Sequence, residues 1–270
     1  GEVDLQARSL NFSDYTFLKE GEKRHNYTVR LWRTAGGARL ALYPNLNVRD
    51  DAWRGLFRDV RLRRALSLAI NRHEINQVMY YGLGIEGNNT VLPDSPLFEP
   101  KYRDEWASYD PELANQLMDQ IGLTEYDDDD YRLMADGQRL EIIVETAGED
   151  TEQSDVLELV RDAWAVIGIK MYTKPSQREV FRNRIYAGDS QMSIWAGYEN
   201  AMPTPNMSPD EFAPTRQTGL QWPKWGQHYE TSGMAGIAPE LPAAARLLEL
   251  HEEWFRIGRG PERKRIWHEM

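Results

Sequence analysis

Aromatic and polar side chains crowd into one stretch of the sequence, and their types suit the binding of a ring or a peptide. Tryptophan and tyrosine offer flat apolar area together with a polar group, which fits sugar rings or peptide side chains in a concave site. Packing against the core is an equally good explanation for any single one of these aromatic residues. The predicted ligand-binding residues are Trp195, Tyr198, Glu199, Asn200, Trp222, Trp225 and Tyr229.

The sequence does not indicate catalysis. It contains no Gly-x-Ser-x-Gly elbow, no P-loop and no Gly-x-Gly-x-x-Gly after a strand. Aspartate and glutamate total 43, so a sugar hydrolase stays open as an alternative, which requires two carboxylates facing each other about 5–10 Å apart. A protein-interaction domain is a third possibility and predicts a broad exposed apolar patch. We predict a binding protein that is not an enzyme and has no cofactor.

The run Asp127 to Asp130 raises the question of a metal site. A calcium loop needs acidic residues at alternating positions followed by a glycine. Tyr131 stands two positions after Asp129, and no glycine follows in register. The five histidines are scattered along the chain. We therefore predict a hydrated turn at the aspartates and no metal site.

The formal net charge of −11 argues against a polyanionic partner, which would be repelled at long range. Residues 59–84 nevertheless contain four arginines. The apolar positions of this stretch recur at helical spacing, and Asp59 and Asn71 are suitable N-caps. We predict two capped helices whose arginines form a solvated face, and no nucleic-acid partner. The absence of cysteine excludes disulfides and thiol chemistry.

The length of 270 residues allows one large domain or two small ones. No apolar run approaches the roughly 18 residues of a membrane span. The sequence does not begin with methionine and ends within an apparent helix that starts at Pro261. We expect both ends to be cut from a longer protein.

The middle of the chain predicts alternating strands and helices. Strand 139–145, helix 152–167, short strand 169–173, a helix capped by Ser176 and Glu179, and strand 192–196 follow one another. Such alternation implies an α/β sheet with helices on both faces. Farther upstream, residues 27–34 and 38–43 are predicted to form a hairpin around Gly36-Gly37.

Residues 196–237 form a long segment rich in proline and aromatic residues, without helical or strand periodicity. Connections of this length are usually functional. Ligands of open α/β sheets bind beyond the carboxyl ends of strands, so we expect the cleft where strand 192–196 ends. A helix over 240–257 follows, with Leu247, Leu248, His251, Trp254 and Phe255 predicted to face inward.

Several motifs resemble the extracellular solute-binding proteins of family 5, the dipeptide-, oligopeptide- and nickel-binding components of ABC importers. The family pattern Asp–Val–Arg–x–Arg–x–Ala–Leu–x–x–Ala–Ile–x–Arg is matched by Asp59, Val60, Arg61, Arg63, Ala65, Leu66, Ala69, Ile70 and Arg72. Further similar segments, in the same order, are "GEVDL", "YDPELANQLMDQIGL", "ADGQRLEIIVET" and "LVRDAWAVIGIKM".

The resemblance implies a lobe of the type II periplasmic-binding-protein fold, with a mixed sheet flanked by helices. Residues 1–270 would be the second lobe of a two-lobed protein, without its first lobe and last strands. The implied function is non-catalytic capture of an oligopeptide or oligosaccharide between the lobes and delivery to an ABC transporter permease. The implied state is a monomer, and the implied location is the periplasm or the outside of a cell, tethered to its membrane.

The resemblance weakens where specificity is decided. Oligopeptide-binding members carry an aspartate in a Trp–x–x–Asp pattern, and it pairs with the free amino group of the peptide. Tyr198 stands at that position here, with Glu199 next to it. A buried ammonium without its carboxylate is costly. A neutral, ring-bearing ligand such as an oligosaccharide therefore competes with a peptide as the expected ligand.

Overall fold

The computed structural model describes residues 3–8, 10–149 and 151–270, so Gly1 and Glu2 of the "GEVDL" segment lie outside it. A four-stranded mixed sheet forms its centre, in the order β1-β4-β2-β3. Strand β2 runs parallel to both β3 and β4, and β1 runs antiparallel to β4. The strands are β1 (Ala41–Pro44), β2 (Glu141–Thr146), β3 (Lys170–Pro175) and β4 (Met192–Trp195).

The predicted alternation of strands and helices is confirmed. Helix α7 (Thr151–Ala165) links β2 to β3, and α8 (Arg178–Ala187) links β3 to β4. Alternate residues of the sheet face opposite layers: Ile142 and Val144 join the main core with Trp164 of α7, whereas Trp195 stacks on Phe181 of α8. The mixed sheet flanked by helices follows from this alternation.

The predicted capping box of α8 is wrong. The helix begins at Arg178, and its N-cap, Gln177, makes no side-chain capping bond. The hydroxyl of Ser176 is buried without a hydrogen-bond partner among the described residues. Ser176 instead continues from β3, where its backbone N–H donates to the carbonyl of Thr146, so the helix starts too late for Ser176 to cap it.

The predicted hairpin around Gly36-Gly37 is also wrong, because residues 27–34 form no strand. The backbone of residues 35–38 bonds to the segment after β4 instead, with Gly37 donating to the carbonyl of Tyr198 (2.9 Å) and Gly197 to that of Ala38 (3.0 Å). A Cβ atom on Gly37 would lie 2.6 Å from the Asn89 side chain. The glycine therefore permits a close approach between segments and does not make a turn.

Helices α3 (Val60–Leu68) and α4 (Arg72–Tyr80) confirm the predicted pair, with Asp59 and Asn71 as N-caps that accept backbone hydrogen bonds. Their arginines are not a solvated face. Arg72 donates to the carbonyls of Ser67 and Ala107 at 2.9 and 3.1 Å, and Arg64 lies 4.2 Å from the ring centre of Trp106. These guanidinium groups satisfy carbonyls and cover an aromatic ring, so they tie the helices to neighbouring loops.

The remaining helices of the body are α2, α5 and α6. Helix α2 (Asp51–Arg58) precedes the pair and buries Trp53 and Phe57. The dipeptide Asp110-Pro111 predicts a helix start. Helix α6 (Pro111–Gln120) begins there, with Asp110 as its N-cap and proline in the first turn. Helix α5 (Pro100–Asp104) is a short turn in a loop.

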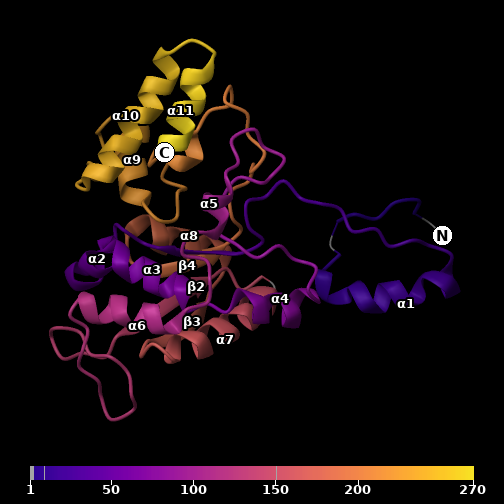
Figure 1. Cartoon of the computed structure of the whole chain (residues 1–270), viewed down its shortest axis with the longest axis horizontal. Helices are drawn as coiled ribbons and strands as arrows, with labels where there is room; N and C mark the ends of the chain where they lie inside the picture. Colours follow the sequence, from indigo (N-terminus) through magenta and orange to yellow (C-terminus); the bar gives the residue numbers. More distant parts are fainter. Residues whose placement is uncertain (1–2, 9, 150) are drawn as a thin grey trace.

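The chain before β1 forms an arm that projects from the body (Figure 1). It contains the short 3₁₀ helix η1 (Phe12–Asp14) and helix α1 (Tyr15–His25), which has no buried residue. Large apolar side chains of this arm are exposed, among them Phe17 and Trp32. The arm therefore adds no core of its own.

Two helices sit together above the body in the view of Figure 1, away from the arm. Helix α10 (Pro242–Arg256) confirms the helix predicted over 240–257, but Phe255 is 58% exposed, so its predicted inward orientation is wrong. Helix α11 (Pro261–Glu269) packs beside it and forms a small core with residues that include Leu250, Trp254 and Ile266.

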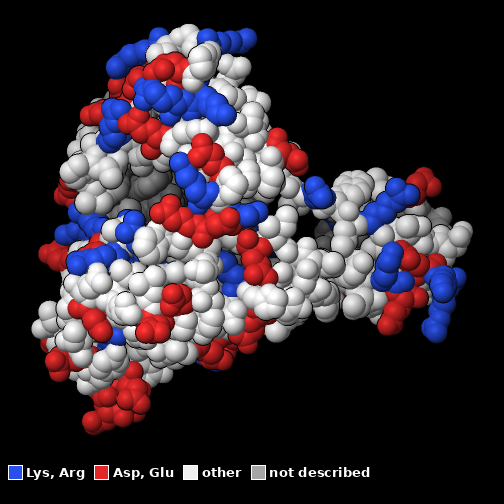
Figure 2. All heavy atoms as spheres, viewed as in Figure 1, with Lys and Arg blue, Asp and Glu red and all other residues white. Residues whose placement is uncertain are grey.

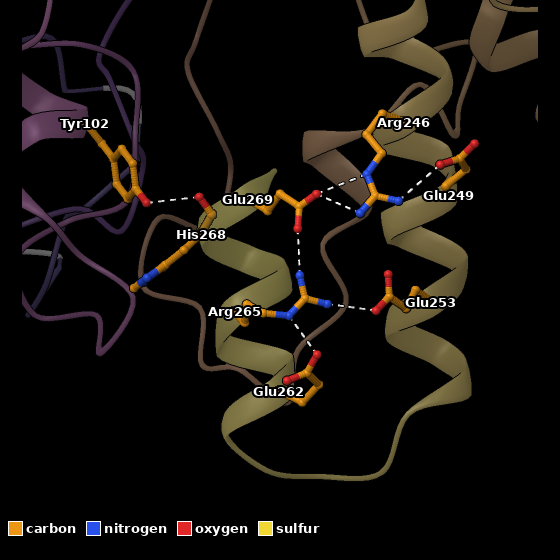
Figure 3. A network of polar contacts seen from close by, with 8 residues as sticks. All are labelled: Tyr102, Arg246, Glu249, Glu253, Glu262, Arg265, His268 and Glu269. Carbon is orange, nitrogen blue, oxygen red and sulfur yellow. Dashed lines mark hydrogen bonds and ion pairs between the residues drawn. The ribbon is translucent and has the colours of Figure 1, made fainter.

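Ion pairs connect the exposed sides of α10 and α11 (Figure 3). Arg265 contacts Glu253 at 2.8 Å, and Glu269 accepts from both Arg246 and Arg265 at 2.7 and 2.6 Å. Exposed pairs of this kind contribute little individually. The buried apolar residues between the helices therefore hold the two helices together, and the ion pairs fix how the helices align with each other.

Candidate ligand-binding site

A large cleft of about 1320 Å³ opens beside the edge strand β1. Its floor is apolar and combines strand residues such as Ile194 with helix residues such as Leu66 and Val160. Trp32, 67% exposed, and the half-buried Tyr80 lie on its rim. A mostly apolar, concave site with aromatic walls is the usual form of a small-molecule site.

Polar groups at the rim of this cleft are already organised by one carboxylate. Glu152 pairs with Arg39 and accepts a hydrogen bond of 2.7 Å from the Tyr80 hydroxyl. Burial alone would raise the pKa of Glu152, but these contacts outweigh it and hold the pKa below its ordinary value. The carboxylate is thus kept ionised, and it fixes the aromatic ring of Tyr80 at the rim.

Tyr198 and Glu199 lie next to this cleft and do not line it. The backbone N–H of Tyr198 donates to the Asn89 side chain at 3.0 Å, and its ring stacks on Phe212 with centroids 4.4 Å apart. Asn89 itself lines the cleft. The chain after β4 therefore forms the support behind the rim at residues 36–38 and 88–89.

Acidic groups cluster at this carboxyl end of β4. The backbone N–H of Glu199 donates to the Glu211 carboxylate, yet burial and the charge of Glu199 raise the pKa of Glu211. Burial and the charge of Glu211 raise the pKa of Tyr198 to about 12. Burial also raises the pKa of Tyr43, whose hydroxyl donates to the carbonyl of Ala196 at 2.7 Å. A cation placed here would relieve this mutual repulsion.

Trp195 and Asn200 have local partners. The Trp195 ring lies 5.8 Å from that of Phe181 and 5.5 Å from the guanidinium carbon of Arg178. The Asn200 side-chain oxygen accepts from the backbone N–H of Met202 at 3.1 Å, which closes a turn. Both residues stand where the sequence predicts, after the apolar strand, but neither lines the cleft.

The other three predicted residues lie elsewhere. Residues 196–237 are not without regular structure, because they contain η2 (Asp210–Phe212) and helix α9 (Pro223–Glu230). Asn47, just after β1, accepts from the backbone of Lys224 and Trp225 at 2.9 and 3.2 Å. Because Pro44 of antiparallel β1 pairs with Met192, α9 begins near the amino end of β4, opposite to Tyr198.

Burial excludes Trp225 from direct ligand contact, which corrects its predicted role. Its side chain is 0% exposed and belongs to the main core, against which Trp222 also packs. The Tyr229 hydroxyl lies 3.3 Å from His251 Nδ1 and connects α9 to α10. Trp222 and Trp225 thus hold the long segment against the main core, and Tyr229 links it to α10.

Sequence reasoning missed the aromatic and amide groups that line the cleft, including Trp32, Tyr80, Asn76, Asn88 and Asn89. Trp32 lies within residues 27–34, for which the sequence predicts a strand. The signal available was the Gly-, Asn- and Pro-rich composition of residues 82–96, which is typical of a binding loop.

The acidic run forms a turn, as predicted. Asp127 accepts from the backbone N–H groups of Asp129 and Tyr131 at 2.9 and 3.0 Å, and both aspartates pair with Arg139. Among the described residues, no group of three or more His, Asp or Glu side chains is arranged to hold a metal ion. The run is thus satisfied by local backbone and one arginine.

Residues 1–219 match the family model of the bacterial extracellular solute-binding proteins, family 5. The chain belongs to this family. Family 5 proteins bind solutes without catalysis, which confirms the prediction of a binding protein and sets the hydrolase alternative aside. The structure agrees, with a periplasmic-binding-protein-like arrangement of the mixed sheet and its helices.

Several solved and curated proteins are similar to this family 5 protein. It superposes on the oligopeptide-binding protein OppA with a TM-score of 0.81 and 29% identity, covering 99% of this chain and 44% of that one. The dipeptide-binding protein of Escherichia coli is 24% identical over 175 residues, which are 62% of this chain and 29% of that protein. Heme-binding protein A of Haemophilus influenzae is 25% identical over 155 residues, which are 57% and 26% of the two chains.

A sugar-binding relative shares the fold. The binding protein MelB of Agrobacterium fabrum, solved with stachyose, superposes with a TM-score of 0.74 at 14% identity and covers 95% of this chain and 39% of that one. The chain thus spans less than half the length of the relatives it matches. Within the described residues, no helix combines the length and apolar character needed to cross a bilayer.

Proposed function

We propose that this chain is the second lobe of a two-lobed receptor that captures an oligopeptide or oligosaccharide and delivers it to an ABC transporter permease. The supporting observation is the apolar cleft of about 1320 Å³ with Trp32 and Tyr80 on its rim. A single lobe offers half of the contacts, so the ligand is held when the first lobe closes over this face. The receptor would act as a monomer in the periplasm or on the outer side of a cell membrane.

An oligopeptide is the first candidate. OppA is similar over nearly the whole of this chain, and the acidic pair of Glu199 and Glu211 lies beside the position of the missing aspartate. A free ammonium would relieve the repulsion that raises the pKa of Glu211. Glu211 would therefore pair with the ammonium in place of the missing aspartate.

An oligosaccharide is the second candidate, favoured by Asn88 and Asn89 along the cleft, whose side chains each use an amide atom within the fold. Amides donate and accept at once, which suits the hydroxyl groups of a sugar. The exposed Trp32 ring offers a flat surface for stacking a sugar ring. A neutral ligand of this kind needs no carboxylate.

Tryptophan fluorescence of the full-length protein, titrated with short peptides, their N-acetylated forms and oligosaccharides, tests the proposal. We expect saturable binding that the Trp32→Ala change weakens about tenfold or more, as for a central aromatic contact. Dependence on a free amino terminus, lost in Glu211→Gln, identifies a peptide. A response to sugars that Glu211→Gln leaves intact identifies an oligosaccharide.

Tyr172→Ala is the matched control, because Tyr172 is a 45% exposed aromatic residue on the opposite edge strand, β3. The Tyr172→Ala variant should bind the peptide or oligosaccharide as tightly as the unmodified protein does. The proposal fails if neither class of ligand gives a saturable response, or if Trp32→Ala and Tyr172→Ala bind equally well.

A further inference from the structure

A second, smaller pocket of about 290 Å³ lies near the amino end of β4, away from Tyr198. Helix α2, the turn after β1, the end of α8, the start of α9 and residues 237–240 enclose it. Figure 2 shows the surface hollowed between the body and the overlying helices, with Lys and Arg side chains below the hollow. The residues that line this pocket are Asn47, Arg49, Arg54, Arg58, Ala187, Lys224, Ile237 and Glu240.

Cations dominate the lining. Four cationic residues, Arg49, Arg54, Arg58 and Lys224, line the pocket with one acidic residue, Glu240. Outside the lining, Arg49 pairs with Asp189 at 2.7 Å and Arg54 pairs with Asp51. Lys224, and Arg58 once Glu240 moves away, therefore supply the positive charge that a small anion can meet in this concave site.

Fold contacts hold two of these arginines in place. Arg54 donates to the carbonyls of Val48 and Arg49 at 3.1 and 3.0 Å. Arg58 has a side chain only 18% exposed, donates to the carbonyl of Leu46 at 3.0 Å and lies over the Trp225 ring at 5.2 Å. The guanidinium groups are therefore positioned before any ligand arrives.

Donor groups remain unused at the pocket. The side-chain nitrogen of Asn47, a residue 5% exposed, has no partner in the described chain. Lys224 forms no ion pair with a described residue and only a long contact of 3.5 Å with Gln227. Arg58 uses Nη2 to pair with Glu240 at 2.6 Å and Nε to donate to the carbonyl of Leu46, and its Nη1 makes no hydrogen bond to a described residue.

We propose that this pocket binds a small oxyanion with two negative charges, such as a phosphate group or a dicarboxylate. The anion takes hydrogen bonds from Lys224 and Arg58, and it replaces Glu240 as the partner of Arg58. The Glu240 side chain is 56% exposed, so it can move aside into water. The pocket lies at the opposite end of β4 from Tyr198 and shares no lining residue with the solute cleft.

Calorimetric titration of the full-length protein with inorganic phosphate, glycerol phosphate and malonate, in buffers matched for ionic strength with chloride, tests this site. We expect saturable binding that Lys224→Gln weakens about tenfold, the worth of a charged hydrogen bond. Glu240→Gln should strengthen binding about threefold, because it removes a competing carboxylate. Preference among the three probes tells a free phosphate, a phosphomonoester and a carboxylate ligand apart.

Lys23→Gln is the matched control, since it removes the same charge from α1, far from the pocket. It should bind as the unmodified protein does. The proposal is overturned if no probe binds beyond the chloride control, or if Lys23→Gln and Lys224→Gln weaken binding equally. It is also overturned if Glu240→Gln weakens binding. Each of these results assigns the pocket to structural ion pairing alone.

Discussion

The two ends of strand β4 differ in chemistry, although the sequence joins them through one continuous segment. The carboxyl end carries the tyrosines and glutamates around Tyr198 and Glu211, beside the large apolar cleft. The amino end carries the arginines and the lysine of the smaller pocket, with Arg58 over the buried ring of Trp225. Trp225 at the amino end therefore packs in the core, whereas Tyr198 at the carboxyl end supports the rim of the large cleft.

The largest expected effect concerns the two tryptophans that this comparison separates. Trp225→Ala should lower the free energy of unfolding by about 3–5 kcal/mol, because it leaves a cavity in the main core. Trp32→Ala should change it by less than about 0.5 kcal/mol, because Trp32 is 67% exposed. Urea denaturation measures both, and equal losses would contradict the assignment of one residue to the core and the other to the cleft.

Asn47 joins β1 to the start of α9 at the amino end. Asn47→Ala removes the oxygen that accepts from the backbone of Lys224 and Trp225, and should cost about 1–2 kcal/mol, the value of a helix cap. Asn200→Ala at the carboxyl end removes one exposed turn contact and should cost less. Thermal unfolding followed by circular dichroism compares the two variants; a larger loss for Asn200→Ala would reverse the ranking.

Asp210 anchors η2 to α10 through His251 Nε2 at 2.6 Å, with Ser208 and Arg216 as further partners. Burial would raise its pKa, but these partners outweigh burial and lower it. A depressed acid pKa stabilises the fold above the unfolded pKa of about 4, and this contribution is lost as the pH falls further. Asp210→Asn should therefore lower the free energy of unfolding by up to about 1 kcal/mol at pH 7 and by much less near pH 3. Denaturant unfolding curves at both pH values measure this difference. A difference that does not depend on pH would refute this origin.

The neighbouring Glu211 should give the smallest effect, with the opposite sign. Its raised pKa means that the fold loses stability as the pH rises from the unfolded pKa through the folded one. Glu211→Gln should slightly raise the melting temperature at pH 7 and leave it unchanged at pH 3. A lower melting temperature at pH 7 would mean that the carboxylate is satisfied by its neighbours and does not repel Glu199.

Local signals predicted much of the body. The alternation from β2 to β4, the caps Asp59, Asn71 and Asp110, and the turn at Asp127 depend on residues close in sequence, and all of them are present. The hairpin at Gly36-Gly37 failed because the partner of that backbone lies about 160 residues farther along. Propensity within a short window cannot detect such a pairing.

The candidate site was predicted only in part. The position of Tyr198 and Glu199 after β4 followed from the rule for open α/β sheets, and the structure adds Glu211 through the chain reversal at η2. Trp32 and the amides of the cleft come from segments before β2, and no local pattern joins them to β4.

The sequence by itself determined the family, the order of strands and helices in the β2–β4 unit and the absence of an enzyme motif. These depend on hydrophobic period, capping residues and motif spacing, all of which act over short stretches of chain. Tertiary structure alone decided which aromatic residues reach a surface and where the cations gather. The physical reason is that burial and electrostatic field arise from groups brought together from distant parts of the chain, such as Asn47 and Lys224 at one end of β4 and Asn89 and Tyr198 at the other.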